Sequence, residues 1–401
     1  MLRQAFILSG GLGTRLKEKT KNTPKPMLTV GERPFLEYII WNLKRHGITT
    51  IILSVGYLSE QIIKYFDDGS RFRVTIDYVV EKEPAGTGGA LLLAKNKLDD
   101  IFFMLNGDTL FDINYLDLAL QTVNELSSVG VALRYTENVE RYGKVNLEGD
   151  KIIDFNEKVG HGYGLINSGV YVFDKKLLAK QHILIPSSLE KDLLPSLAKE
   201  GHLKGIVYHG FFIDIGLKHS FLEANISVPH WQKKPTVFLD RDGILNIDYG
   251  YVYRPSDFDW VDGAIETIKR FNDIGYLVIV ITNQAGIARG YYSEEDFYIL
   301  NEWMNEELRR VGAHIDAVYY CPHHPTEGYS PYRMECNCRK PAPGLIKQAL
   351  EEWPIDKNNS VLIGDQEKDM QAAHSAGIKG MLFKGGNLLS FMRQILRRIE
   401  E

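Results

Sequence analysis

The sequence predicts an α/β protein with two domains, each containing a doubly wound and mostly parallel sheet. The chain has 401 residues, more than one hydrophobic core usually organises, so two or three domains are expected. Short apolar runs alternate with segments of helical periodicity in both halves, as in βαβ units with right-handed crossovers. A new α/β pattern begins at Thr236. We therefore expect domains at residues 1–228 and 236–401, joined by the stiff linker 229–235, which contains two prolines and two lysines.

The composition is that of an ordinary globular protein, with 44% hydrophobic and 25% charged residues. The formal net charge of −5 argues against nucleic-acid binding, because such proteins usually carry a basic field. No apolar run approaches the roughly 18 residues that a membrane-spanning helix needs, and the apolar run at the N-terminus is too short for a signal peptide. We therefore expect a cytoplasmic protein that acts on small molecules, with neither nucleic acid nor a membrane as partner. The sequence carries no indication of oligomeric state.

The first domain is expected to begin with a regular alternation of strands and helices. Apolar runs predict strands at residues 5–9, 50–55, 74–80 and 101–105. Helical apolar spacing predicts helices at residues 35–45, 59–66 and 88–96. Parallel strands end at one edge of their sheet, and open α/β sheets bind ligands at that carboxyl edge. Functional residues are therefore expected in the loops that follow the strands.

A glycine-rich loop, GGLGTRL, follows the first strand directly at residues 10–16. Glycines here let backbone N–H groups approach phosphate oxygens, and Arg15 adds a fixed cation. Two prolines hold Lys25 in a stiff extended segment, which lowers the entropy cost of positioning its ammonium group. A second glycine-containing junction, PAGTGG at 84–89, lies between a strand and a helix. The candidate nucleotide-binding residues are Gly10, Gly11, Gly13, Thr14, Gly86 and Thr87.

Two aspartates at strand ends are candidate magnesium ligands. The run at 101–105 continues into Asn-Gly-Asp, which places Asp108 at the ligand-binding edge. Mg²⁺ favours one or two carboxylates together with substrate oxygens, so a second carboxylate is expected. Asp214, with apolar neighbours and a following glycine, is the best candidate. Each aspartate alone is typical of a turn or a helix cap, and the glycine-rich loop favours the metal site.

The motifs GGLGTRL, TPKPML, GTGGA, NGD, FNEK, INSGVYVF and DIG occur in this order over residues 1 to about 225. This half of the chain resembles the sugar-1-phosphate nucleotidyltransferases. The resemblance implies that the glycine-rich loop and Arg15 handle nucleotide phosphates and that Lys25 neutralises charge at the reacting centre. It implies metal at Asp108 and Asp214. It also implies sugar-phosphate contacts from Glu157, Lys158 and Asn167. In this family an oxygen of the sugar 1-phosphate attacks the α-phosphorus of a nucleoside triphosphate, so catalysis is mostly alignment and charge stabilisation.

In the second half, TVFLDRDGILN at 236–246 predicts a buried strand that ends in two carboxylates. Asp240 and Asp242 are two residues apart, so an extended chain would put both side chains on the same side. Gly243 then lets the chain turn away without filling the site with a side chain. Further strands are expected at residues 276–281, 317–320 and 360–363, and helices at 263–274 and 294–310. Two of these strands are followed by Thr282 and by Asp365.

From 236 to about 390 the chain resembles the haloacid dehalogenase (HAD) superfamily of phosphatases. The resemblance implies that Asp240 attacks phosphorus to form an aspartyl phosphate, with Asp242 as general acid and then general base. It implies Mg²⁺ on Asp240, Asp242 (through its backbone carbonyl) and Asp365. The candidate phosphate- and substrate-binding residues are Thr282, Asn283, Arg289, Arg339 and Lys340. About forty residues separate Asp240 from Thr282, which leaves no room for a large cap domain.

All cysteines of the chain lie in one loop, close to two histidines. Three thiolates and one imidazole form a closed set of ligands that is typical of structural zinc sites, and such a site suits a reducing compartment. The expected zinc ligands are Cys321, His323, Cys336 and Cys338. His324 is an alternative to His323 that the sequence leaves open. A loop fixed in this way would deliver Arg339 and Lys340 toward the phosphate.

Within the superfamily, DRDGILN, TNQAGIARGYYS, CPHHP, CNCRKP and GDQEKDMQAA resemble the heptose 1,7-bisphosphate 7-phosphatases. A phosphatase that releases a sugar 1-phosphate would supply a nucleotidyltransferase that uses one. The two resemblances together imply a bifunctional enzyme that removes the 7-phosphate of D-glycero-D-manno-heptose 1,7-bisphosphate and joins heptose 1-phosphate to a nucleotide. The product would be an activated heptose for surface glycans. GTP is favoured, because the heptose-activating members of the transferase family are guanylyl-specific.

Other interpretations stay open at the level of sequence. One is a hexose-1-phosphate nucleotidyltransferase that uses UTP, CTP or dTTP, fused to a phosphatase of different specificity. Another is a nucleotide-sugar sensor that regulates the phosphatase, although a sensor would not need Lys25, Asp108 and Asp214. A nucleic-acid end-processing phosphatase is disfavoured by the charge balance.

Overall fold

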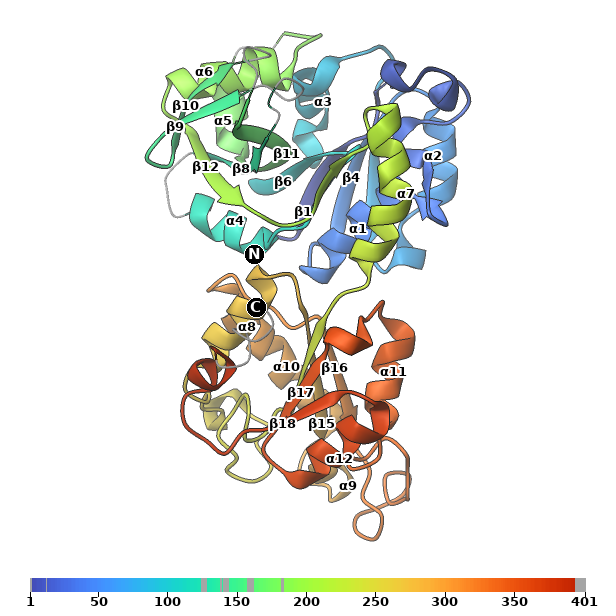
Figure 1. The fold of residues 1–401 in the computed structure, drawn as a ribbon, viewed down its shortest axis with the longest axis vertical. Helices are drawn as coiled ribbons and strands as arrows, with labels where there is room; N and C mark the ends of the chain where they lie inside the picture. Colours follow the sequence, from blue (N-terminus) through green and yellow to red (C-terminus); the bar gives the residue numbers. More distant parts are fainter. Residues whose placement is uncertain are drawn as a thin grey trace. The chain divides into compact units, whose positions relative to one another are not determined.

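The computed structural model describes residues 2–11, 13–123, 128–137, 139, 144–156, 162–181 and 184–393. The chain divides into two compact units, Met1–Trp231 and Gln232–Glu401, shown in Figure 1. Helix α7 (Lys218–Gln232) ends at this division, so residues 229–232 of the expected linker are helical. None of the described helices is long and apolar enough to cross a membrane.

The first unit contains one large sheet, two short ladders and seven α-helices that the structure describes. The sheet strands are β1 (Gln4–Leu8), β4 (Thr50–Val55), β5 (Thr75–Val80), β6 (Ile101–Asn106), β8 (Val129–Thr136), β9 (Lys144–Glu148), β10 (Lys151–Asn156), β11 (Gly164–Asp174) and β12 (Leu203–Tyr208). The ladders pair β2 (Thr29–Val30) with β3 (Arg33–Pro34), and β7 (Thr109–Phe111) with β13 (Phe212–Asp214). Besides α7, the helices are α1 (Phe35–Arg45), α2 (Ser59–Phe66), α3 (Gly86–Ala94), α4 (Tyr115–Val123), α5 (Lys175–Lys180) and α6 (Leu194–Lys199).

The large sheet has the strand order β5-β4-β1-β6-β11-β8-β12-β10-β9. Strands β5, β4, β1 and β6 are parallel, which confirms the predicted alternation in this part. However, β11 is antiparallel to both β6 and β8, and β10 is antiparallel to both β12 and β9. The prediction of a mostly parallel sheet is therefore wrong for the second half of this unit. One reason is local, because the turn at Gly149 (φ 63°) folds β9 directly back on β10, whereas parallel pairing needs a long crossover.

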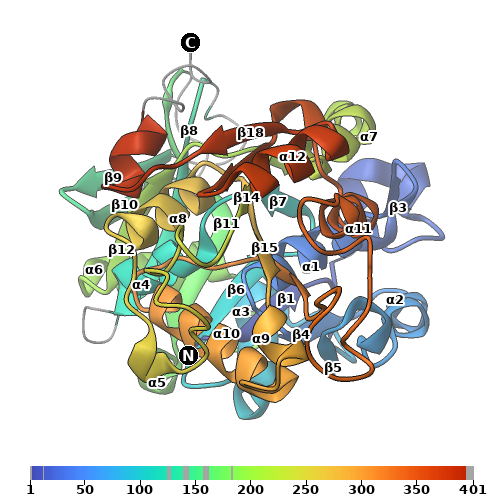
Figure 2. The same ribbon diagram turned by 90° about the horizontal axis from the view of Figure 1, so that it is seen from below.

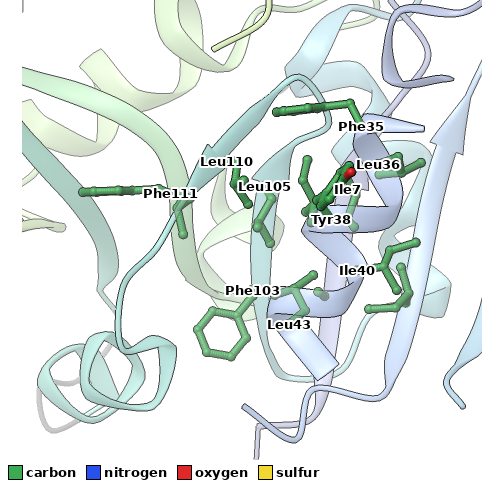
Figure 3. Close-up of a cluster of buried hydrophobic side chains, with 14 of the residues drawn as sticks. Ile7, Phe35, Leu36, Tyr38, Ile40, Leu43, Phe103, Leu105, Leu110 and Phe111 are labelled. Carbon is green, nitrogen blue, oxygen red and sulfur yellow. The ribbon is translucent and has the colours of Figure 1, made fainter. Parts of the chain in front are cut away.

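Helices cover both faces of the large sheet. Apolar side chains of α1, α2, α4 and α7 pack on one face, and those of α3, α5 and α6 pack on the other. Figure 3 shows the α1 side, where Leu43 of the helix lies beside Phe103 of β6. Phe103 of β6 is fully buried there, with its ring edge-on to Tyr115 at 5.7 Å between centroids. This core fixes the carboxyl ends of β1 and β6, which carry the candidate transferase site.

The second unit has a five-stranded sheet in the order β16-β15-β14-β17-β18. Its strands are β14 (Thr236–Leu239), β15 (Leu277–Asn283), β16 (Ala317–Cys321), β17 (Val361–Gly364) and β18 (Lys379–Leu382), all parallel. Its helices are α8 (Ala264–Asp273), α9 (Ala285–Ala288), α10 (Glu294–Arg309), α11 (Gly344–Glu352) and α12 (Glu367–Ala376).

The central position of β14 places its carboxyl end between those of β15 and β17. Helices α8 and α10 lie on one face of the sheet and α11 and α12 on the other (Figure 2). Their apolar side chains pack into two separate clusters on these faces. Between Asp240 and Thr282 the chain forms only one short 3₁₀ turn, α8 and β15, with no separate cap. The prediction of a parallel, uncapped second domain is confirmed.

The separate cores predict that damage in one unit leaves the other folded. Replacing Phe103 by Ala should lower the free energy of unfolding of the first unit by about 3–5 kcal/mol, because a buried ring is lost and a cavity remains. Calorimetry should show one transition moving to lower temperature while the other stays in place. Leu222→Ala is the control, since Leu222 is 54% exposed and should change stability by less than about 0.5 kcal/mol. A common shift of both transitions would contradict independent cores.

Candidate active sites

The second unit brings a lysine and acidic side chains together where its central strands end. Asp240 follows β14, and its Oδ2 lies 2.6 Å from the Nζ of Lys340. The same ammonium lies 2.7 Å from Oδ1 of Asp369 and donates to the carbonyl oxygen of Ile281 at 2.9 Å. The side chains of Lys340 and Asp369 are 1% and 0% exposed. A buried charge is tolerated only when it is paired and hydrogen-bonded, and this arrangement meets both conditions.

Three carboxylates converge beside this lysine. One oxygen each of Asp240, Asp365 and Asp369 lies within 4.8 Å of the others. Gly243 (φ 85°) makes room for them, because a Cβ there would stand 2.4 Å from Oδ2 of Asp365. Oδ1 of Asp365 is buried and accepts no hydrogen bond within the described residues. Converging carboxylate oxygens with a free lone pair fit a divalent cation that prefers oxygen ligands, such as Mg²⁺.

The charges of this cluster are unbalanced, with three carboxylates for one ammonium group. Burial raises the pKa of Asp240 to about 6; Lys340 opposes this rise and Asp369 adds to it. Burial and the neighbouring Asp369 also raise the pKa of Asp365. Burial acts to lower the pKa of Lys340, but Asp240 and Asp369 hold it above its usual value. A bound divalent cation would supply the missing positive charge.

Asp369 is a member of this cluster that the sequence reasoning did not assign. It lies in the first turn of α12, which begins directly after the loop that carries Asp365. Its Oδ2 accepts a hydrogen bond from the backbone N–H of Gln366 at 3.1 Å, which closes the helix cap. An acidic residue in the first turn is common as a cap, so the sequence signal alone did not separate a cap from a ligand.

The carboxylate of Asp242 lies outside the cluster of three carboxylates, and the expected metal contact through its backbone carbonyl stays a prediction. It accepts hydrogen bonds from the guanidinium of Arg241 at 2.9 Å, from Asn246 at 3.1 Å and from Gln284 at 3.1 Å. The Arg241 guanidinium is 1% exposed and fixes the Asp242 carboxylate, which is 23% exposed. These contacts fix the orientation of the Asp242 carboxylate.

Gln284 is a second residue that the sequence reasoning missed, although it lies in the TNQ motif. Its side chain is buried, and Nε2 donates to Asp242 at 3.1 Å and to Oγ1 of Thr282 at 2.8 Å. Its Oε1 accepts from the hydroxyl of Tyr292 at 2.5 Å. Gln284 therefore links the proposed proton-transfer carboxylate to the end of β15.

The side chain of Asn283 binds the backbone of Lys340, and the expected phosphate contact stays a prediction. Its Nδ2 donates to the carbonyl oxygen of Lys340 at 3.1 Å, and its Oδ1 accepts from the N–H of Lys340 at 3.0 Å. Both polar atoms of the amide are thus used on the backbone of Lys340. Asn283 positions the lysine, and the lysine side chain reaches the carboxylates.

The two candidate arginines both brace the loop that carries Lys340. Nη2 of Arg289 lies 2.9 Å from the carboxylate of Glu327 and 3.4 Å from Nε2 of His324. Nη1 of Arg339 donates to the carbonyl oxygen of His323 at 3.2 Å. Arg289 is partly exposed, so it remains accessible to a substrate.

The cysteine loop forms a compact cluster of four metal-binding atoms. The cluster contains Cys321, His323, Cys336 and Cys338. The Sγ atom of Cys338 lies 3.2 Å from those of Cys321 and Cys336 and 3.3 Å from Nδ1 of His323. By contrast, Nδ1 of His324 accepts from the N–H of Glu327 at 2.9 Å. The cluster thus includes His323 and not His324, and its thiolate-rich ligand set fits zinc.

The first unit brings its two candidate metal ligands to one short ladder. Asp214 pairs with Thr109, the residue after Asp108, across strands β13 and β7. The N–H of Ile215 also donates to the carbonyl oxygen of Asp108 at 3.0 Å. Lys25 forms an ion pair with the carboxylate of Asp108. The backbones of the two aspartates therefore lie side by side at one edge of the unit, with Lys25 paired to Asp108.

The glycines of the first loop have different structural roles. A Cβ on Gly10 would stand 2.6 Å from Oε1 of Glu81, and Gly13 takes a left-handed conformation (φ 61°) against Lys25. A Cβ on Gly11 would meet nothing within 4 Å, so its backbone is open to an approaching ligand. Arg15 is exposed, and the Thr14 side chain lies outside the described part.

Other candidates of the first unit serve internal contacts or lie outside the described residues. A Cβ on Gly86 would stand 2.3 Å from the carbonyl oxygen of Ser187. The hydroxyl of Thr87 donates to Glu190 at 3.0 Å and accepts from the N–H of Leu189 at 2.7 Å. Both residues therefore dock α3 against the segment before α6. Nδ2 of Asn167 donates to the hydroxyl of Tyr171 at 2.7 Å. Glu157 and Lys158 lie outside the described residues.

In both units a lysine pairs with an aspartate that follows a parallel strand, Asp108 after β6 and Asp240 after β14, an arrangement that suits the transfer or hydrolysis of phosphoryl groups. The chain belongs to the nucleotidyl transferase family, whose model matches residues 4–230. The HAD-hydrolase-like family model matches residues 337–393. The protein is thus a bifunctional enzyme with a nucleotidyltransferase domain and a HAD phosphatase domain.

Named relatives match the two halves separately. The D-glycero-β-D-manno-heptose-1,7-bisphosphate 7-phosphatase of Pasteurella multocida is 49% identical over 154 residues, 38% of this chain and 83% of the relative. The D-glycero-α-D-manno-heptose-1,7-bisphosphate 7-phosphatase of Burkholderia mallei is 47% identical over 146 residues, 36% of this chain and 77% of the relative. The crystal structure of HddC from Yersinia pseudotuberculosis, also solved with GMP-PN, is 31% identical with a TM-score of 0.52 and covers 57% of this chain and all of HddC.

The position of Asp369 predicts a measurable role in phosphate-ester hydrolysis. Asp369→Asn keeps the size of the side chain but removes a charge from Lys340 and from the carboxylate cluster. We expect hydrolysis to fall about 10–100-fold and to need more Mg²⁺ for half-maximal rate. The measurement is the rate of phosphate release against Mg²⁺ concentration. Glu367→Gln, an exposed change on the same helix, is the control, and equal behaviour of the two variants would contradict the assignment.

The cysteine cluster predicts that each chain binds one zinc ion and that His323, not His324, is a ligand. His323→Ala should lose most of the zinc, because one of four ligands is removed, whereas His324→Ala should retain it. Zinc content after dialysis, measured by plasma mass spectrometry, tests both variants. Full retention in His323→Ala, or equal loss in both, would show that His323 is no ligand.

Proposed function

We propose that the enzyme makes an activated heptose in two steps. The second unit removes the 7-phosphate of D-glycero-D-manno-heptose 1,7-bisphosphate, and the first unit joins the resulting heptose 1-phosphate to GMP from GTP, releasing GDP-heptose and pyrophosphate. One observation carries this proposal: a single chain combines a half similar to heptose-1,7-bisphosphate 7-phosphatases with a half similar to HddC, which was solved with GMP-PN. The three thiols gathered in one cluster fit a reducing compartment, so we place the enzyme in the cytoplasm.

In the phosphatase unit, a carboxylate oxygen of Asp240 attacks the phosphorus of the 7-phosphate. The bond from phosphorus to the sugar oxygen breaks, and Asp242 gives its proton to that oxygen as it leaves. Asp242 then takes a proton from water, whose oxygen attacks the aspartyl phosphate and releases inorganic phosphate with Asp240 restored. The contacts from Arg241 and Gln284 hold the Asp242 carboxylate in place for both transfers.

Asp240, Asp365 and Asp369 would hold Mg²⁺, with the backbone carbonyl of Asp242 as a further oxygen ligand. When bound, this ion neutralises charge on the transferring phosphoryl group. Lys340 adds a second positive charge on the same side, since it lies 2.6 Å from Asp240. Arg289 and Arg339 line the loop beside the site and would contact the sugar or its second phosphate.

In the transferase unit, an oxygen of heptose 1-phosphate attacks the α-phosphorus of GTP and pyrophosphate leaves, so no protein nucleophile is needed. The open backbone at Gly11 and the exposed Arg15 would bind the triphosphate. Lys25 lies against Asp108, where charge develops on the α-phosphate. Asp108 and Asp214 would hold Mg²⁺, and Glu157, Lys158 and Asn167 would contact the sugar phosphate.

The decisive experiment supplies heptose 1,7-bisphosphate with GTP, UTP, CTP, ATP or dTTP and follows phosphate and pyrophosphate together. We expect phosphate with every nucleotide and pyrophosphate chiefly with GTP.

Asp240→Asn should reduce phosphate release at least about a thousandfold, because the nucleophile is lost, while transfer to preformed heptose 1-phosphate continues.

Lys25→Ala should show the reverse pattern, with phosphate release intact and pyrophosphate lost. Asp257→Asn, an exposed change, is the control and should leave both activities unchanged. Phosphate without pyrophosphate for every triphosphate would refute the transferase half, and pyrophosphate with dTTP but not GTP would refute the choice of base.

A further inference from the structure

The first unit carries a pocket of about 480 Å³ along the outer side of α1. Glu37, Ile40, Trp41 and Lys44 line it from one face of this helix, at the spacing that puts helical side chains on a common side. The opposite wall comes from the end of α2 and from the short helix η3 (Ser70–Phe72). Its volume is in the range of small-molecule sites.

This pocket is separate from the transferase site. Lys44 lies at the end of α1, shortly before β4 begins at Thr50, and Arg71 and Arg73 lie shortly before β5 begins at Thr75. These side chains therefore belong to the amino edge of the parallel strands. The catalytic candidates follow the carboxyl ends of β1 and β6, which is the opposite edge of the same sheet.

The pocket has an excess of positive charge. Four of its side chains are cations, namely Arg33, Lys44, Arg71 and Arg73. The one acidic side chain in its lining, Glu37, is already engaged by Arg33 at 3.3 Å and by the hydroxyl of Tyr65 at 2.7 Å. Lys44, Arg71 and Arg73 form no ion pair within the residues that the structure describes. Burial and the neighbouring Arg73 lower the pKa of Lys44, as expected where like charges face each other without a counter-ion.

The same pocket also has ring surfaces. Trp41, Tyr65 and Phe72 line it, and the guanidinium of Arg71 lies over the rings of Tyr65 and Phe72 at 4.6 Å from each centroid. One guanidinium group can bind two phosphate oxygens at once, and guanidinium groups and aromatic rings both stack on flat heterocycles. Unpaired cations beside stacking surfaces match a ligand that carries both phosphate and an aromatic ring.

We propose that this pocket binds a nucleoside diphosphate, either free or as its sugar ester. The phosphates would lie on Lys44, Arg71 and Arg73, and the base would lie on the ring surfaces. Because the pocket is at the amino edge of the sheet, this ligand and a nucleotide at the catalytic edge can bind together. The first unit therefore takes two equivalents of nucleotide.

The test is calorimetric titration of the full-length chain with GDP and with GDP-mannose, a commercially available sugar ester. The wild type should bind two equivalents of at least one of these probes. Lys44→Met with Arg73→Gln should bind one equivalent, or weaken the second at least about tenfold, because charge-assisted contacts are lost. Transferase activity at low nucleotide concentration should be unchanged. Lys64→Met, an exposed lysine on α2 outside the pocket, is the matched control and should keep two equivalents.

The choice of guanine for the probe rests on the proposed function, so UDP is titrated in parallel to distinguish a wrong base from an absent pocket. Tighter binding of GDP-mannose than of GDP identifies the sugar ester as the occupant, and equal binding identifies the nucleotide. One equivalent in the wild type with every probe overturns the proposal, as do two equivalents in the double variant. If pyrophosphate binds the pocket as well as GDP does, the pocket is a site for inorganic anions. If the double variant changes its oligomeric mass, this face is a subunit interface. Either result overturns the proposal.

Discussion

The second unit depends on one buried ammonium group. Lys340 is 1% exposed and lies between two carboxylates, at 2.6 Å from Asp240 and 2.7 Å from Asp369, with a backbone carbonyl as third partner. Removing one partner of a buried charge pair is far more costly than removing an exposed one, because the other charge is left in a low dielectric. The lysine thus holds the carboxylates of two different segments, the end of β14 and the start of α12, beside each other. The third carboxylate, Asp365, then leaves the cluster with a negative excess that a bound cation or a proton would balance.

The backbone that carries a buried lysine must be held in a fixed position, and the surrounding loop holds it. Asn283 clamps the backbone of Lys340 by two hydrogen bonds, and the cluster of three cysteines and His323 closes the loop just before it. Arg339 adds a contact to the carbonyl of His323. A metal at the cysteine cluster is therefore structural by position, since it fixes the segment that delivers Lys340 and contributes no group to the carboxylates. This explains why a loop rich in cysteine and histidine lies beside a site whose chemistry needs neither.

The sequence predicts the second unit better than the first, for physical reasons. Uninterrupted apolar runs identify parallel strands buried on both faces, so β14, β15 and β17 and the polar residues after them were predictable. The antiparallel strands after β7 alternate more weakly, and their pairing depends on contacts distant in sequence. At the sites, Asp240 and Asp365 were predicted from their positions at strand ends, and Lys25 was predicted from the prolines on both sides of it. Asp369 and Gln284 were missed because their contacts join segments that are distant in sequence and meet only in the folded structure. A phosphate contact was predicted for Asn283 because the sequence does not distinguish an amide side chain that binds phosphate from one that binds the backbone of another segment.

Both units pair a lysine with a carboxylate, but the two lysines differ in how rigidly they are held. In each, a lysine forms an ion pair with a carboxylate expected to hold Mg²⁺, so the lysine lies where phosphate charge will be. The side chain of Lys340 is 1% exposed and has three partners. The side chain of Lys25 is 14% exposed and Asp108 is 31% exposed, on a loop where Gly11 leaves open space. In the proposed mechanism the phosphoryl group is held covalently on Asp240, and this step needs a preformed electrostatic environment because the reaction centre stays fixed on the protein. A nucleotidyl group that passes between two bound substrates needs a lysine able to follow the α-phosphate as pyrophosphate leaves. The exposure of the two lysines therefore corresponds to the two kinds of chemistry.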